Sequence, residues 1–151
     1  MVKNIAVGMA TGLLSGLILG FLLKLFESIS GIRVYALLLN VDFLPAIGLT
    51  EWSEAWEFSF HLVTSLAIGV AYTVLTSAWM IQKASGQFIV SFLLVLPASL
   101  LYFPLSFWAV EMLTSPSDLR GFGLWTAGHI VYAFCLPIFS RPFLTRERKH
   151  R

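Results

Sequence analysis

Residues 4–27 read NIAVGMATGLLSGLILGFLLKLFE, an apolar stretch with a glycine at every fourth position from Gly8 to Gly20. A helix rises about 1.5 Å per residue, so a stretch of roughly 20 residues crosses a hydrocarbon core of about 30 Å. Residues four apart lie nearly above one another, and glycines there leave a groove that another backbone can approach closely. The stretch therefore predicts a membrane span that packs tightly through Gly8, Gly12, Gly16 and Gly20.

Three more apolar stretches of comparable length follow the first, and no polar region between them is long enough for a separate soluble domain. The chain is 58% hydrophobic and 12% charged, whereas about 25% of the residues of a soluble domain are charged. We therefore predict one all-α integral membrane domain over residues 1–151, a four-transmembrane-helix bundle. Its four spans are Ile5–Phe26, Phe58–Ile81, Phe88–Val110 and Phe122–Phe139.

Basic residues are segregated to one side of the predicted spans. Of the ten Lys and Arg residues, seven lie at the chain ends or in the turn between spans two and three, including a basic tail over 141–151. Lys24, Arg33 and Arg120 fall on the opposite side. The positive-inside rule then predicts a multi-pass membrane protein with both termini in the cytoplasm. The short tail favours contact with the lipid bilayer over nucleic-acid binding.

The first outer loop contains a second, shorter apolar segment. The segment Arg33–Leu49 is too short to span, and Pro45 and Gly48 interrupt it. Apolar backbone at membrane depth must satisfy its own hydrogen bonds, so we expect a helix in this loop that is either interfacial or partly re-entrant.

The second span repeats the four-residue spacing of the first. Small residues occur at Ser65, Gly69, Thr73 and Ser77. Small residues at this spacing are typical of helices that pack closely in lipid. We therefore expect Ser65 and Gly69 to face the glycine stripe of the first span in an antiparallel helix pair.

Ionisable residues gather in the outer third of the predicted bundle, where Lys24 joins Glu57, His61, Glu111 and His129. Antiparallel packing of the first two spans would bring Lys24 close to Glu57 and His61. Ionisable residues within spans are costly unless they face the interior, which makes them functional candidates. The cluster either responds to protons or closes the outer end of the bundle. Its spacing lacks a metal-site pattern such as His-Glu-x-x-His, so we predict no metal and no other cofactor.

The surroundings of His61 and His129 decide how acid would act on the protein. Imidazole titrates near pH 6.5. A carboxylate beside it would stabilise the charged form, and that stabilisation would be lost as the pH rises. Burial without such a partner would favour the neutral form, and acid would then destabilise the fold.

The sequence lacks the motifs of common enzyme classes. It has no Walker loop, no Gly-x-Ser-x-Gly elbow and no cysteine pair, since Cys135 is its one cysteine. We therefore predict no enzymatic activity. One remaining class is a structural or interaction protein of the cell envelope that carries the outer His/Glu cluster, with a second copy or another membrane protein as partner.

The alternative class is a small proton-linked or cation transporter. A carrier needs a polar path across the whole bundle, whereas the inner half of the predicted spans offers mainly Ser, Thr and Gly. This difference favours the structural or interaction class.

A set of motifs from the second span onward carries a family resemblance. These are His61-Leu-Val-x-Ser65, Ala71-Tyr72, Gly86, Leu105, Pro116 and Trp125-x-x-Gly128-His129-x-Val131, followed by the basic tail. In these residues the chain resembles the YagU family of small bacterial inner-membrane proteins. The resemblance implies a multi-span membrane protein without known enzymatic activity, associated broadly with acid tolerance.

The predicted orientation can be tested with single cysteines in place of Lys3, Ala84 or Arg148. All three positions are predicted to face the cytoplasm, so a membrane-impermeant thiol reagent added to intact cells should not label them. Labelling from outside the cell at these sites would reverse the predicted orientation.

Overall fold

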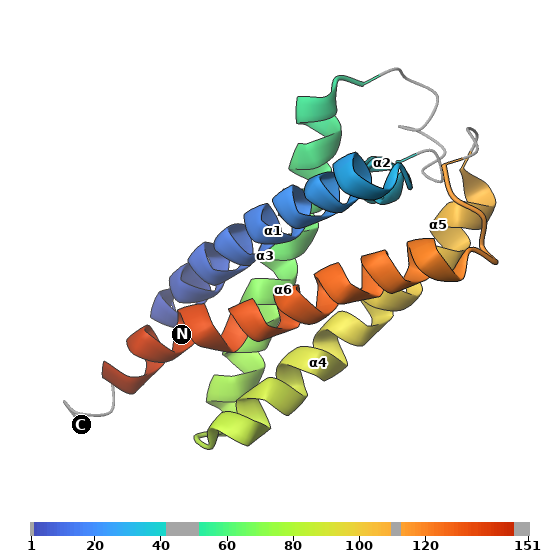
Figure 1. The fold of residues 1–151 in the computed structure, drawn as a ribbon. Helices are drawn as coiled ribbons and strands as arrows, with labels where there is room; N and C mark the ends of the chain where they lie inside the picture. The colour runs from blue at the N-terminus through green and yellow to red at the C-terminus, as the bar shows by residue number, and fades with distance from the viewer. Residues whose placement is uncertain (1, 42–51, 110–112, 147–151) are drawn as a thin grey trace.

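A computed structural model describes residues 2–41, 52–109 and 113–146, and side chains up to residue 143. Every regular element within these ranges is an α-helix (Figure 1). The helices in chain order are α1 (Val2–Ser30), α2 (Val34–Leu39), α3 (Glu54–Ala78), α4 (Ala84–Leu100), α5 (Tyr102–Trp108) and α6 (Leu119–Arg146).

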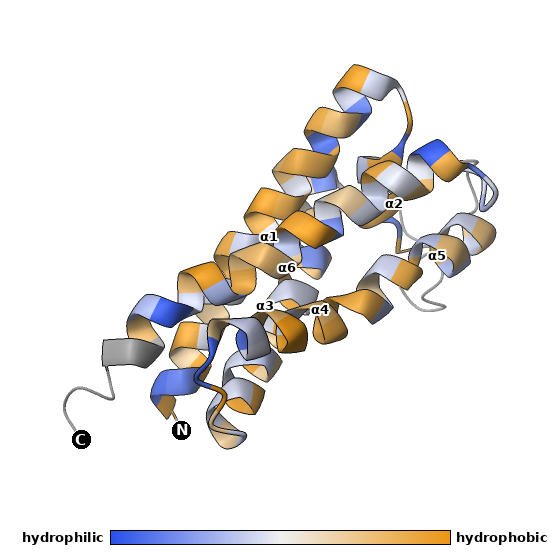
Figure 2. Cartoon of the chain, turned by 60° about the horizontal axis from the view of Figure 1, so that its bottom comes forward, coloured by the Kyte–Doolittle hydropathy of each residue, from blue (hydrophilic) through white to orange (hydrophobic). Residues whose placement is uncertain are grey.

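Four helical segments are long and apolar enough to cross a membrane, which confirms the prediction of four such helices. They cover Val2–Ser30, Glu54–Ala78, Ala84–Trp108 and Leu119–Phe143. Apolar residues make up most of these helices (Figure 2), and large side chains such as Phe21, Ile89 and Leu93 are more than half exposed. An outward apolar surface of this kind is what a lipid environment requires.

The second span ends three residues earlier than predicted, at Ala78 rather than Ile81. Met80 adopts a left-handed backbone conformation with φ of 49°. The Met80 amide donates to the Ser77 carbonyl at 3.2 Å, and the Ile81 amide donates to the Thr76 carbonyl at 2.9 Å. These two bonds form the Schellman arrangement that satisfies the last carbonyls of α3 and turns the chain toward α4.

Helix α1 packs against α3 through its glycine stripe, so closely that the two backbones touch. A Cβ atom added at Gly12 would lie 2.3 Å from the Ser65 carbonyl oxygen, and one added at Gly8 would lie 2.7 Å from the Val70 Cα. A Cβ atom on Gly69 would lie 2.6 Å from the Gly12 Cα. None of these positions has room for a side chain.

A second stripe on α1 faces α6. It consists of the buried residues Thr11, Ser15, Leu19 and Leu23. Opposite it, a Cβ on Gly128 would lie 2.8 Å from Leu23 Cδ2. Helix α1 therefore contacts both α3 and α6, and α4 in turn packs on α6.

Two polar contacts fasten α1 to α3 at opposite ends. At the end near the chain termini, Asn4 Nδ2 donates to Ser77 Oγ at 2.8 Å. At the other end, Lys24 Nζ pairs with Glu54 Oε1 at 2.5 Å. The two α1 residues are 20 positions apart, which is about 30 Å along a helix and equal to the thickness of a hydrocarbon core. We call the end that holds Lys24 the outer end.

The third span divides into α4 and α5 at Leu101, although Leu101 itself keeps right-handed helical dihedrals (φ −60°, ψ −15°). Pro104 follows this break and has no amide hydrogen to donate. The predicted kink region therefore separates α4 from the short α5.

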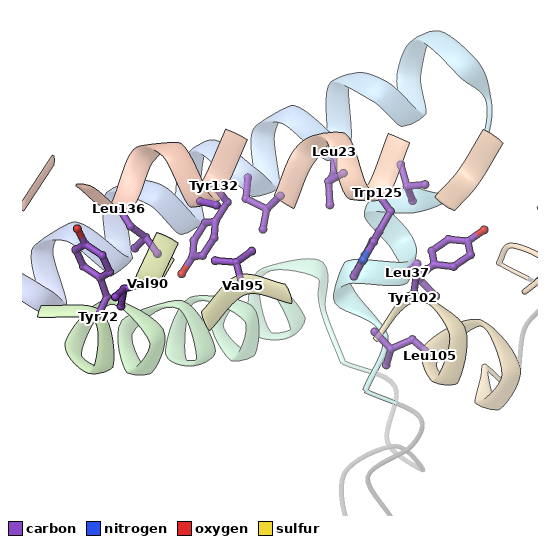
Figure 3. Close-up of a cluster of buried hydrophobic side chains, with 13 residues drawn as sticks. Leu23, Leu37, Tyr72, Val90, Val95, Tyr102, Leu105, Trp125, Tyr132 and Leu136 are labelled. Carbon is purple, nitrogen blue, oxygen red and sulfur yellow. The ribbon is translucent and has the colours of Figure 1, made fainter. Parts of the chain in front are cut away.

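Helix α2 fills the outer end of the bundle. Val34 and Leu37 are fully buried, and Leu37 lies beside Trp125, Tyr102 and Leu105 (Figure 3). The Glu27 carboxylate accepts hydrogen bonds from the first amides of α2, at Tyr35 and Ala36. The start of the predicted interfacial or re-entrant segment is thus a buried helix, while residues 42–49 of that segment lie outside the described residues.

The backbone contact between α1 and α3 can be tested with alanine in place of two glycines. Alanine stabilises an exposed helix interior by about 1 kcal/mol relative to glycine. Gly123, in α6, has no atom within 4 Å of an added Cβ, so Gly123→Ala should be neutral or stabilising. Gly12→Ala should instead destabilise the fold by about 1–3 kcal/mol, because its methyl group meets backbone that cannot move aside.

Thermal unfolding in detergent measures both variants. Leu14→Phe, on the exposed side of α1, serves as a further control and should also be tolerated. Equal stability of Gly12→Ala and Gly123→Ala would contradict the close packing of α1 on α3.

Candidate functional site

His129 lies in the interior of the bundle, held by the turn of α6 that precedes it. The residue is 4% exposed. Its Nδ1 donates to the Trp125 carbonyl at 2.8 Å, and its ring lies against the Trp125 ring with 4.5 Å between centroids. A carbonyl oxygen accepts, so Nδ1 carries the proton in the neutral ring and Nε2 is left able to accept one.

His61 joins α3 to the glycine stripe of α1. Its Nε2 donates to the Gly16 carbonyl at 3.1 Å, and its ring lies 5.6 Å from the Phe58 ring. A side chain in place of the glycine hydrogens would hold the two helices further apart. The close approach of α1 and α3 thus brings a backbone carbonyl within reach of an imidazole.

His61 on α3 and His129 on α6 lie at the same depth of the bundle. One turn further inward on both helices, the Tyr132 hydroxyl donates to the Ser65 carbonyl at 3.4 Å. Each imidazole is held by a hydrogen bond to a backbone carbonyl, His61 to Gly16 and His129 to Trp125.

Lys24 pairs with Glu54, one turn before the Glu57 near which we expected it from the sequence. Partner positions on α1 and α3 fall in a constant antiparallel register, with Gly20 against Phe58 and Gly16 against Leu62. That register places Lys24 level with Glu54. Glu111, the remaining member of the predicted cluster, lies outside the described residues.

Sequence reasoning missed two residues of this outer cluster, Glu54 and Tyr35. The Tyr35 hydroxyl donates to Glu54 Oε1 at 2.9 Å, and Lys24 Nζ lies 5.1 Å above the Tyr35 ring. Burial, followed by the hydrogen bond to Glu54, raises the pKa of Tyr35 well above its usual value. Tyr35 therefore stays protonated and remains a donor. The apolar segment that contains Tyr35 predicted a helix in this loop. Nothing in the sequence indicated which carboxylate the Tyr35 hydroxyl would bind.

An open cleft of about 340 Å³ adjoins this cluster. Three helices line it, through the residues Gly20, Phe21, Lys24, Tyr35, Glu54, Ala55 and Phe58. One side of the cleft is charged and the other is apolar. Within the described ranges, no group of three or more His, Cys, Asp or Glu side chains is placed to hold a metal ion.

Trp125 positions His129 and also closes the break in the third span. It is 2% exposed, and its Nε1 donates to the Ser99 carbonyl at 2.9 Å. Ser99 lies just before the point where α4 ends. The indole thus binds the end of α4, while its own carbonyl and ring hold the imidazole.

Comparison of the chain with models of protein families, with curated proteins and with solved structures gives no match. The resemblance to the YagU family stays a prediction from the sequence.

The role of the indole can be tested with Trp125→Phe. The variant keeps an aromatic ring beside His129 but leaves the buried Ser99 carbonyl without its donor, which should cost about 1–2 kcal/mol. The control is Trp108→Phe, at a position 58% exposed, which should change stability by less than about 0.5 kcal/mol. Similar unfolding temperatures for the two variants would contradict the assigned role of the indole hydrogen bond.

Proposed function

We propose that the chain is a small multi-pass protein of the bacterial inner membrane, with both termini in the cytoplasm and a structural or interaction role that responds to acid. The observation that carries this proposal is that two imidazoles, the half-buried His61 and the buried His129, lie at one depth of the bundle and each donate to a backbone carbonyl. An acid-related role agrees with what the YagU resemblance implies.

Both rings are stable in the interior as neutral imidazoles, whereas two charged imidazolium rings are not. Each ring donates one hydrogen to a carbonyl oxygen, from Gly16 or from Trp125. A second proton on each ring would place positive charge in an apolar interior, where charge is costly. Acid would therefore destabilise the packed bundle.

Other titratable groups surround the pair on each packed element. Glu57 lies one turn outward from His61 on α3, and Lys24 and Glu54 lie at the outer end of α1 and α3. Helix α2 contributes Tyr35, and α6 contributes Tyr132, one turn from His129, and the buried Cys135 further along the helix. Both carboxylates named here are nearer the outer end than the two rings.

The polar residues of the inner half support fastening of helices rather than transport. Thr73 Oγ1 donates to the Asn4 carbonyl across the α1–α3 contact, and Thr76 Oγ1 donates to the Tyr72 carbonyl of its own helix. Ser91 Oγ donates to the Ala133 carbonyl and joins α4 to α6. These hydroxyls bind protein backbone, so we assign the chain neither a carrier function nor an enzymatic activity.

The acid response can be measured as thermal stability in detergent between pH 8 and pH 5. We expect stability to fall below about pH 6.5, because unfolding releases both rings to water, where they accept protons freely. The double variant His61→Gln, His129→Gln should flatten this profile.

The matched control is His150→Gln, at the third histidine of the chain, which lies in the basic tail. This variant should show the same dependence of thermal stability on pH as the unchanged protein. If the double variant keeps that profile as well, the histidines are ordinary hydrogen-bonding residues and the acid response is not theirs.

A further inference from the structure

The cleft at the outer end lies at the depth of a lipid headgroup. Lys24 is 20 residues from Asn4 along α1, or about 30 Å. The polar contacts of these two residues with α3 therefore bracket one hydrocarbon thickness. A cleft lined by Lys24 opens where acyl chains end and headgroups begin.

The cleft has an apolar wall that continues into the lipid-facing surface. Phe21 is 68% exposed, and Phe58 lies across Gly20, whose missing side chain makes room for the ring. An acyl chain entering from the bilayer would contact these two aromatic rings. The apolar wall and the polar rim together match an amphipathic ligand.

The polar rim presents one cation beside one anion. The side chains of Lys24 and Glu54 are 54% and 58% exposed, and a pair this exposed is weak enough to exchange partners. A phosphate can replace Glu54 as the partner of Lys24, and an ammonium can replace Lys24 as the partner of Glu54. The Tyr35 hydroxyl, now donating to Glu54, is a second donor within the same rim.

We propose that this cleft binds a zwitterionic phospholipid with a primary amine, a phosphatidylethanolamine. Its phosphate lies on Lys24, its ammonium on Glu54, and one acyl chain along Phe21 and Phe58. A primary ammonium donates hydrogen bonds to a carboxylate, whereas a choline headgroup has no N–H to donate. Phosphatidylglycerol has the same phosphate but a neutral glycerol in place of the ammonium, so Glu54 would be left without a cation.

This inference rests on the membrane placement in the proposed function and is independent of the acid response. It is tested by native mass spectrometry of the detergent-purified protein with phosphatidylethanolamine, phosphatidylcholine and phosphatidylglycerol of identical acyl chains. We expect phosphatidylethanolamine to bind about tenfold more tightly than the other two, the effect of one charge-assisted hydrogen bond. Lys24→Gln and Glu54→Gln should each remove this preference.

Matched variants separate the headgroup contact from a loss of fold. Lys83→Gln removes an exposed lysine in the α3–α4 turn and should leave lipid binding unchanged. Lys24→Arg keeps the cation, so it should retain the preference even if Lys24→Gln fails to fold. The double variant His61→Gln, His129→Gln should bind phosphatidylethanolamine normally, so the lipid site and the acid response can fail separately.

Equal binding of the three lipids would overturn the proposal. So would an unchanged preference in both Lys24→Gln and Glu54→Gln. Full displacement of phosphatidylethanolamine by millimolar inorganic phosphate would also overturn it, because the cleft would then be a phosphate site that does not recognise lipid.

Discussion

The close approach of α1 and α3 along the glycine stripe is the constraint on which the rest of the structure depends. In lipid there is no hydrophobic gain from bringing two apolar helices together, so packing contacts and hydrogen bonds must hold them. Glycines let the two backbones touch, with a Cβ on Gly69 only 2.6 Å from the Gly12 Cα. This contact fixes the register of the two helices and, through it, which side chains meet.

The register of α1 against α3 explains both the outer cleft and the hydrogen bond of His61. Because Gly20 lies opposite Phe58, Lys24 lies opposite Glu54, and the outer cleft forms between them. Because the Gly16 Cα lies close to the Ser65 and Leu62 side chains of α3, its carbonyl is within reach of His61 and accepts a hydrogen bond from it. Helix α6 then packs on the other face of α1 and brings His129 to the same layer. One packing contact thus organises a surface site and the layer of the two histidines.

The sequence was sufficient to predict the four long helices and the stripe, because apolar length and four-residue spacing are local properties of the chain. It also indicated that His61 and His129 share a layer. The pairing of Lys24 with Glu54 could not be predicted from the sequence, since spacing gives the period of a helix face but not the register between two faces. The burial of α2 could not be predicted either, because Val34 and Leu37 are covered by Trp125 and its neighbours, which come from distant parts of the chain.

The most direct test of this account is a distance between glycines of the two helices in lipid bilayers. The 2.6 Å separation of a Gly69 Cβ from the Gly12 Cα, with a C–C bond of about 1.5 Å, places the two Cα atoms within about 4 Å. Solid-state NMR of protein labelled with ¹³C at glycine Cα should therefore show a strong Gly12–Gly69 contact. Glycines four apart on one helix are about 6 Å apart. If no contact between glycines of α1 and α3 is shorter than that, the helices do not touch and the account is wrong.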